Sequence, residues 1–168
     1  MIELVDDFLP DDEFEALRDV VMGLGMHWYY TPNITTHNIT DDRHFYMSHI
    51  FYNSNKYSDM FKFVTPLLNR VMPHGLIRIK ANMYPNQGER VTHEAHFDYD
   101  FPHRAALFSI NDCDGATVIG GEEFGSKANR IVFFDGSQLH SSTTCTDAPV
   151  RVNININYAE GEVGAQRG

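Results

Sequence analysis

Two histidines, an aspartate and an arginine in the second half of the chain are the residues whose types and spacing point to chemistry. His96 and Asp98 are separated by one residue, His140 follows much later, and Arg151 lies eleven residues beyond it. Because side chains alternate along a β-strand, His96 and Asp98 would point the same way from one strand. Two imidazole nitrogens and one carboxylate are the ligand set of a non-haem Fe(II) site. The sequence therefore predicts a metal centre.

The spacing of His96 and Asp98 carries little weight alone. Nine histidines and 23 acidic residues in 168 positions give about one chance match to His-x-acidic. The context adds weight, because an apolar run at residues 130–134 and a turn-like Asp135-Gly136-Ser137 precede His140. His140 therefore opens a new strand or ends the turn that leads into one.

Arg151 begins the clearest strand pattern in the chain. Polar and apolar residues alternate, with Arg151, Asn153, Asn155 and Asn157 on one face and Val152, Ile154, Ile156 and Tyr158 on the other. An arginine on an inward polar face needs an anionic partner, because a guanidinium cannot lose its charge and is costly to bury unpaired. A bound dicarboxylate would supply such a partner.

These features together resemble the 2-oxoglutarate- and Fe(II)-dependent dioxygenases, most closely their prolyl 4-hydroxylase-like branch. The resemblance covers residues 76–158, and a strand followed by Asp7-Phe8-Leu9-Pro10 is similar to the start of these enzymes. The matching segments are Ile77 to Tyr84, His96-Phe97-Asp98, Asn111-Asp112, Gly120-Gly121-Glu122, the strand into His140, and Arg151 to Asn155.

The resemblance implies three iron ligands, namely His96, Asp98 and His140. It implies that Arg151 binds the distal carboxylate of 2-oxoglutarate, that Tyr84 hydrogen-bonds this cosubstrate, and that Asn153 assists the arginine. The implied activity is hydroxylation of an unactivated C–H bond, most closely of a prolyl or other peptidyl substrate, with succinate and CO2 as coproducts. The implied cofactors are Fe(II) and 2-oxoglutarate, with ascorbate as a candidate reductant.

Other functions remain open at this point. An oxygenase of a small molecule or nucleobase would use the same site, although the base-repair dioxygenases commonly carry a second arginine where this chain has Asn157. A non-catalytic barrel used for binding is a third class. The segment Gly120-Gly121-Glu122-Glu123-Phe124 also matches the signature of diguanylate cyclases. Too few residues separate it from Asn111-Asp112 for a crossover unit, so a tight turn is the better interpretation.

Composition indicates one soluble domain spanning residues 1–168. The chain is 42% hydrophobic and 12% aromatic, which is enough for a sizeable core. No apolar run reaches the length of a membrane span and no signal segment begins the chain, so we expect a cytoplasmic protein. Two cysteines are too few for a disulfide scaffold. The net charge of −10 argues against non-specific nucleic-acid binding and permits a peptide or small-molecule substrate. The oligomeric state is left open.

The predicted elements give an α+β architecture. We expect a helix over residues 10–23 capped by Asp6 or Asp7, a strand at 28–30, an exposed loop at 31–43 and a strand at 44–52. A second helix is expected at 58–72, with Pro66 kinking it or starting its main part, followed by about eight strands over 76–158. The family resemblance makes this a double-stranded β-helix, a jelly-roll or cupin-like barrel with both helices on one sheet.

The remaining histidines are expected to have ordinary roles. Most histidines of soluble proteins are exposed or hydrogen-bonded structural residues. His93 is predicted to point away from His96 on a strand, and His103 is kept as a candidate residue of the substrate pocket.

Overall fold

The computed structural model of the chain describes residues 1–32 and 45–160. Within these residues it contains two α-helices and one 3-10 helix, which are α1 (Asp11–Val21), η2 (Phe61–Val64) and α2 (Thr65–Val71). The strands are β1 (Glu3–Val5), β2 (Tyr29–Thr31), β3 (Tyr46–Asn53), β4 (Lys56–Tyr57), β5 (Leu76–Pro85), β6 (Arg104–Ser109), β7 (Ala116–Ile119), β8 (Glu122–Gly125), β9 (Ile131–Asp135), β10 (His140–Ser142) and β11 (Val150–Tyr158).

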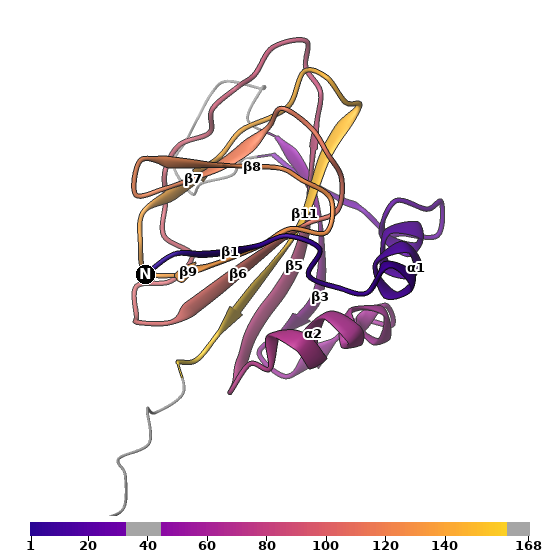
Figure 1. Ribbon diagram of the computed structural model, residues 1–168, viewed down its shortest axis with the longest axis vertical. Helices are drawn as coiled ribbons and strands as arrows, with labels where there is room; N and C mark the ends of the chain where they lie inside the picture. The colour runs from indigo at the N-terminus through magenta and orange to yellow at the C-terminus, as the bar shows by residue number, and fades with distance from the viewer. Residues whose placement is uncertain (33–44, 161–168) are drawn as a thin grey trace, which may run out of the picture.

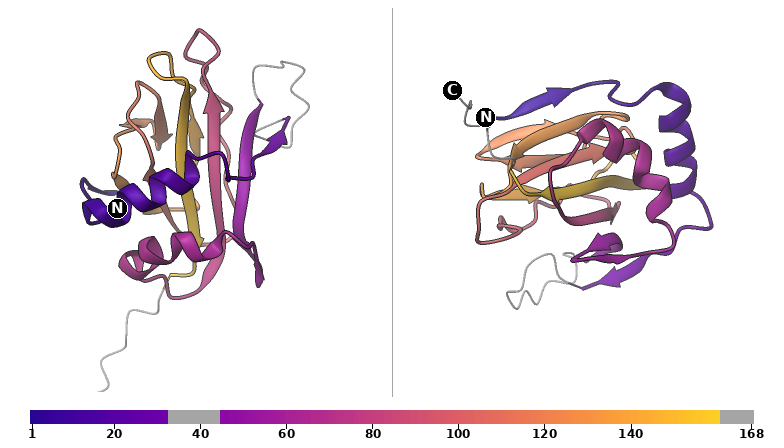
Figure 2. Two further views of the ribbon diagram at one scale, coloured as in Figure 1. Left: turned by 90° about the vertical axis from the view of Figure 1, so that its right-hand side faces the viewer. Right: turned by 90° about the horizontal axis from the view of Figure 1, so that it is seen from below.

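The strands form two antiparallel sheets. The larger sheet has eight strands in the order β1-β9-β6-β11-β5-β3-β2, with β4 paired to β3. The smaller sheet has the order β10-β7-β8. Figure 1 shows α1 and α2 on one side of the larger sheet and the β7-β8 hairpin on the other, and the views in Figure 2 agree. The expected α+β architecture, with both helices on one sheet, is confirmed.

The alternation of polar and apolar residues along β11 shows which face of the larger sheet packs against the helices. Its apolar residues Val152, Ile154 and Ile156 are fully buried and pack in the main core. That core includes residues of α1, η2 and α2, so the apolar face of β11 lies under the helices. The polar face must then point toward the smaller sheet, because side chains on a strand alternate. The side chains that β11 places between the two sheets are therefore polar.

Helix α1 forms because apolar residues recur at helical spacing. Phe14, Leu17 and Val21 are its buried residues. The expected cap is wrong, since Pro10 occupies the N-cap position and no side chain caps the helix. Asp6 instead forms ion pairs with Lys127 at 2.9 Å and with Arg130 at 2.6 Å. This carboxylate joins β1 to the loop before β9 rather than starting a helix.

The second predicted helix is divided in two. Residues Phe61–Val64 form the 3-10 helix η2, and α2 follows it directly. Pro66 lies in the first turn of α2, where a missing N–H leaves no hydrogen bond unmade. Of the two roles considered for Pro66, starting the main helix is the correct one.

The described residues match the strand prediction only in part. Residues 33–44, which include most of the expected loop and His44, lie outside the described residues. Between residues 76 and 160 the structure has seven strands, against about eight expected over 76–158. Residues 86–103 form no regular strand, so the predicted strand through His96 and Asp98 is wrong. Gly120 and Gly121 have positive φ values of 59° and 89° and turn β7 into β8, as a tight turn requires.

None of the helices within residues 1–32 and 45–160 has both the length and the apolar character of a membrane-spanning segment.

Candidate metal centre and its pocket

A pair of backbone hydrogen bonds joins His96 to His140. The His96 N–H donates to the His140 carbonyl at 2.9 Å, and the His140 N–H donates to the His96 carbonyl at 3.1 Å. This isolated antiparallel bridge holds the loop that carries His96 against the first residue of β10. The two imidazole rings lie side by side, with centroids 4.8 Å apart. This single bridge brings His96 beside His140, which a continuous strand was expected to do.

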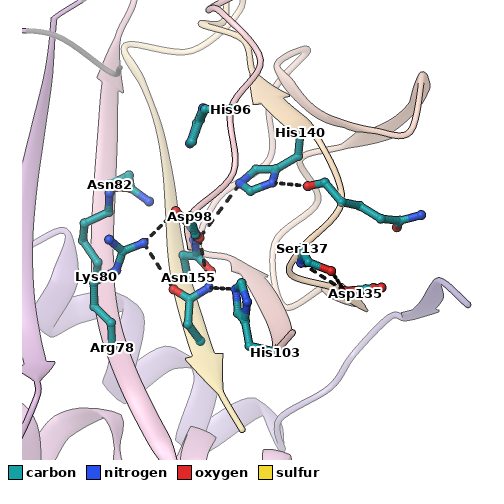
Figure 3. Close-up of polar contacts among 12 residues, drawn as sticks. Arg78, Lys80, Asn82, His96, Asp98, His103, Asp135, Ser137, His140 and Asn155 are labelled. Carbon is teal, nitrogen blue, oxygen red and sulfur yellow. Dashed lines mark hydrogen bonds and ion pairs between the residues drawn. The ribbon is translucent and has the colours of Figure 1, made fainter. Parts of the chain in front are cut away.

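The three predicted ligands converge at one point. One nitrogen of His96, one nitrogen of His140 and one carboxylate oxygen of Asp98 all lie within 4.8 Å of one another. Nε2 of His140 is 3.9 Å from Oδ2 of Asp98. Figure 3 shows the three side chains converging from two segments far apart in the sequence.

Both imidazoles are held in the tautomer that metal binding needs. Nδ1 of His140 lies 2.9 Å from the Gln138 carbonyl, and Nδ1 of His96 lies 3.3 Å from the Glu94 carbonyl. A carbonyl oxygen only accepts, so each Nδ1 carries the hydrogen and each Nε2 keeps its lone pair. Burial, and then the neighbouring His140, lower the pKa of His96, which favours its neutral, ligating form. The donor set therefore fits a divalent transition metal.

Asp98 is held by hydrogen bonds on both oxygens. Arg78 donates to Oδ1 at 2.7 Å, while Asn155 and Asn157 donate to Oδ2 at 2.8 and 2.9 Å. Burial by itself raises the pKa of Asp98, but the Arg78 cation, then His140, Lys80 and the Asn157 hydrogen bond, lower it further than burial raises it. The net result is a pKa well below the usual range, so this carboxyl group stays ionised.

Arg78, Asn155 and Asn157 are site residues that the sequence prediction missed. In the register of β5 and β11, Asn157 is paired with Arg78 and Asn155 with Lys80. The polar alternation of β11 placed both asparagines on the inward face, but it did not indicate that they would bind Asp98. Arg78 could have been placed only by knowing that β5 pairs with β11.

His103 lies behind this group and does not line the pocket. Its Nδ1 is 2.9 Å from the Phe101 carbonyl, so Nε2 has a free lone pair and lies 3.3 Å from Nδ2 of Asn157. The Asn157 amide therefore spans His103 and Asp98. A role for His103 as a pocket-lining residue is not what the structure shows.

An open pocket with about 420 Å³ of empty space, part of which is open to solvent, leads to the three side chains. Strand β5 contributes Lys80, Asn82 and Tyr84 to its wall, and β11 contributes Asn153 and Asn155. The other lining residues are Tyr46, His96, Asp98, Leu107, Thr117, His140, Ser141 and Ser142. The pocket thus lies between the two sheets, on the polar face that β11 was expected to present.

Arg151 lies directly behind this wall. It is fully buried, and its two terminal nitrogens donate to the Thr117 hydroxyl at 2.6 Å and to the Thr143 carbonyl at 3.2 Å. Its Nε is buried without a hydrogen-bond partner, and no ion pair joins it to a carboxylate of the described residues. Burial lowers the pKa of this guanidinium. A buried cation in this state lacks the anion that would normally compensate it.

Tyr84 and Asn153 both line the pocket beside Arg151. Tyr84 is paired with Arg151 across the two strands, and the guanidinium carbon lies 5.4 Å from the tyrosine ring centroid. Asn153 accepts a hydrogen bond from Asn82 at 2.9 Å through Oδ1, while its Nδ2 is buried without a partner. His93 is buried against this group, with Nδ1 2.9 Å from the Ser142 hydroxyl. Tyr84 therefore lies beside the arginine with Asn153 near it, while the His93 ring lies 5.3 Å from the Tyr84 ring.

The chain matches no known protein-family model and no curated protein sequence. It is similar in structure to a prolyl hydroxylase from Trichoplax adhaerens in complex with a hypoxia inducible factor peptide fragment, with a TM-score of 0.70, 13% identity, and coverage of 94% of this chain and 83% of that one. A prolyl-4-hydroxylase from Pseudomonas putida gives a TM-score of 0.58 at 13% identity, over 95% of this chain and 92% of that one.

A third similar structure is HygX from Streptomyces hygroscopicus with nickel, 2-oxoglutarate and hygromycin B bound. It gives a TM-score of 0.62 at 9% identity, over 96% of this chain and 83% of that one. At such identities the likeness concerns the fold. The chain therefore has the double-stranded β-helix fold found in the 2-oxoglutarate- and Fe(II)-dependent oxygenases.

Proposed function

We propose that this protein is an Fe(II)- and 2-oxoglutarate-dependent dioxygenase that hydroxylates an unactivated C–H bond of a prolyl or other peptidyl substrate. The observation that carries the proposal is the convergence of His96, Asp98 and His140 within 4.8 Å at a pocket backed by the buried guanidinium of Arg151. Two imidazoles and one carboxylate leave open positions on Fe(II). A guanidinium without a carboxylate partner gives a diacid its anchor.

Each residue has a defined role in this proposal. His96, Asp98 and His140 hold the metal, and Arg78 with Asn155 and Asn157 keeps Asp98 ionised and oriented. Bound Fe(II) would supply the activation of O2, with 2-oxoglutarate as the electron donor that leaves as succinate and CO2.

The distal carboxylate of 2-oxoglutarate is assigned to Arg151, with Tyr84 and Asn153 beside it. Arg151 lies four residues along β11 from Asn155, or about 13 Å at the usual strand rise. That separation leaves room for a diacid between the arginine and the metal centre. The unpartnered Nε of Arg151 and Nδ2 of Asn153 are buried donors on that side of the pocket.

A peptidyl substrate is supported by the surface around the metal centre. Phe97, Phe101 and Leu139 are 56%, 43% and 48% exposed, and two of them adjoin ligands in the sequence. Exposed apolar side chains next to a pocket offer packing area to a bound chain. The similar structures include one prolyl hydroxylase with a peptide bound.

A small polar substrate is the second candidate. The pocket wall is lined by a lysine and three asparagines, which suit a molecule rich in hydrogen-bonding groups better than an apolar one. HygX, one of the similar structures, holds hygromycin B. A nucleobase has less support, since Asn157 stands where a second arginine would be expected and instead binds Asp98.

An anaerobic titration with Fe(II) and then 2-oxoglutarate tests the proposal. We expect a weak visible absorption band that appears only when both are present, and its loss in His96→Ala and Asp98→Ala. His74→Ala, at an exposed position, is the matched control and should keep the band. A wild-type protein that develops no band would leave the non-catalytic barrel as the better reading. Succinate release, screened over proline-containing peptides, amino acids and nucleosides, then identifies the substrate class.

A further inference from the structure

Among the described residues that line the pocket, Lys80 is the only lysine or arginine, and neither metal binding nor cosubstrate binding has been assigned to it. It lies on the same face of β5 as Arg78 and Asn82, and Figure 3 shows these side chains in one row beside Asp98. In the strand register Lys80 is paired with Asn155, whose amide donates to Asp98 at 2.8 Å. Lys80 therefore lies opposite Asn155, which binds the predicted metal ligand Asp98.

The described residues give the ammonium group of Lys80 few hydrogen-bond partners. It donates one hydrogen bond to the Tyr46 hydroxyl at 3.3 Å, and Nζ lies 5.3 Å from the centroid of that ring. Among residues 1–32 and 45–160, no carboxylate lies within ion-pair distance of it. An ammonium has three N–H donors, so two are left for a ligand. Burial, followed by repulsion from Arg78, lowers the pKa of Lys80 to about 8, so the side chain remains charged at neutral pH.

An acceptor without a partner lies next to this donor. Nδ2 of Asn155 is fixed by Asp98, which can only accept, so the orientation of the amide is determined. Its Oδ1 is buried and has no hydrogen-bond partner. The strand register thus places Oδ1 of Asn155, a buried acceptor, beside the N–H donors of Lys80 that have no described partner. Buried polar groups without hydrogen bonds are costly, and a bound ligand could supply the missing hydrogen bonds.

We propose that Lys80 binds the carboxylate of the primary substrate, and that Asn155 Oδ1 accepts a hydrogen bond from an N–H of the same molecule. A carboxylate beside an N–H is the chemistry of an α-amino acid, either free or at the C-terminus of a peptide. The inference rests on the proposed function, because it names the substrate of that site. The diacid cosubstrate has its own cation in Arg151, on the far side of Asn153 along β11.

The test uses protein loaded with Ni(II) and 2-oxoglutarate, which allows binding to be measured without turnover. The probes are free L-amino acids and tripeptides, each compared with its primary amide by isothermal titration calorimetry. We expect at least one acid to bind about tenfold or more tightly than its amide, as a charge-assisted hydrogen bond requires. Free acids and tripeptides are separate arms, so the preferred arm tells which source of the carboxylate the pocket takes.

Variants of Lys80 connect that preference to the residue. Lys80→Met should remove the preference for acid over amide and leave the dissociation constant of 2-oxoglutarate within about twofold. Lys80→Arg should retain the preference, because it keeps the cation. Lys56→Met, on the exposed strand β4, is the matched control. Circular dichroism and thermal unfolding verify that each variant is folded.

Three results would overturn the inference. They are wild-type protein that binds no acid of the panel or binds acids and amides equally, a Lys80→Met variant that keeps the preference, and a Lys80→Met variant that loses 2-oxoglutarate instead. The last result would make Lys80 a cosubstrate residue. Failure of the proposed function is seen separately, as wild-type protein that binds neither metal nor 2-oxoglutarate while still preferring acids through Lys80.

Discussion

Arg78 donates a 2.7 Å hydrogen bond to Oδ1 of Asp98 from a strand that lies 20 residues before it in the sequence. The side chains are only 17% and 5% exposed, so this is a largely buried ion pair. Asn155 and Asn157 bind the other oxygen from β11. The carboxylate is thereby oriented from two neighbouring strands of the larger sheet before any metal binds.

Replacing Arg78 with Met should destabilise the metal-free protein by about 2–4 kcal/mol, because it leaves a buried carboxylate without its cation. Chemical unfolding at neutral pH measures the loss. Arg18→Met is the control, since Arg18 and Asp19 form an exposed pair at 3.9 Å whose removal should change stability by less than about 0.5 kcal/mol. Equal losses in the two variants would mean that the Arg78 pair has no special role.

The same ion pair predicts a pH dependence. Asp98 has a pKa below its usual value in the folded protein, so its contribution to stability is complete above about pH 4. The contribution is lost as the pH falls toward the folded pKa. The stability difference between wild type and Arg78→Met should therefore shrink as unfolding is repeated at pH values below 4. A difference that stays constant down to the acid limit would contradict the assignment.

Arg151→Met should weaken 2-oxoglutarate binding by about 1.5 to 3 kcal/mol, or roughly 10- to 100-fold, because the distal carboxylate loses its charge-assisted hydrogen bonds. With Ni(II) present, 2-oxoglutarate should raise the unfolding temperature of the wild type far more than that of the variant. Metal binding itself should be preserved, which separates the effect from general damage. A variant that is stabilised as much as the wild type would remove Arg151 from the site.

Lys80 predicts a rise of stability with pH in the alkaline range. Its pKa is about 8 in the folded protein, below the usual lysine value, so the unfolded chain binds more protons between about pH 8 and 10.5. Between these two pH values, the free energy of unfolding of the metal-free wild type should therefore increase more than that of Lys80→Met. Below pH 8 the variant should be the more stable of the two, since it buries no charge. Parallel pH profiles for the two proteins would show that Lys80 is not desolvated.

Gly136→Ala should disturb the support behind Asp98. A Cβ at Gly136 would lie 2.2 Å from Nε2 of His103, the atom that faces the Asn157 amide. We expect a loss of about 1–3 kcal/mol in stability from overpacking and a weaker affinity for Ni(II). At Gly125 an added Cβ meets nothing within 4 Å, so Gly125→Ala is the control and should alter neither quantity much. Normal Ni(II) affinity in Gly136→Ala would show that His103 does not support the metal centre.

Much of the site could be predicted because its signals are local. The alternation from Arg151 to Tyr158 identified a strand with one polar and one apolar face, and both faces are found as expected. The helical spacing of Phe14, Leu17 and Val21 located α1 for the same reason, since each pattern repeats within one element. The residue types of His96, Asp98 and His140 by themselves indicated a metal centre.

The features that the sequence predicted wrongly or did not predict depend on pairing between segments that are distant in the sequence. His96 and Asp98 converge with His140 through a single backbone bridge between loop and strand, which no alternation pattern encodes. Arg78 and Lys80 face the pocket because β5 pairs with β11 in one particular register.

The sequence by itself determined which side chains could bind a metal and a diacid, and which elements would carry them. Only the tertiary structure decided that Arg78 would hold Asp98 and that Lys80 would face the same pocket. The physical reason is that strand register is set by burial of whole sheet faces against distant partners, so a local pattern fixes the face of a residue but not its neighbour.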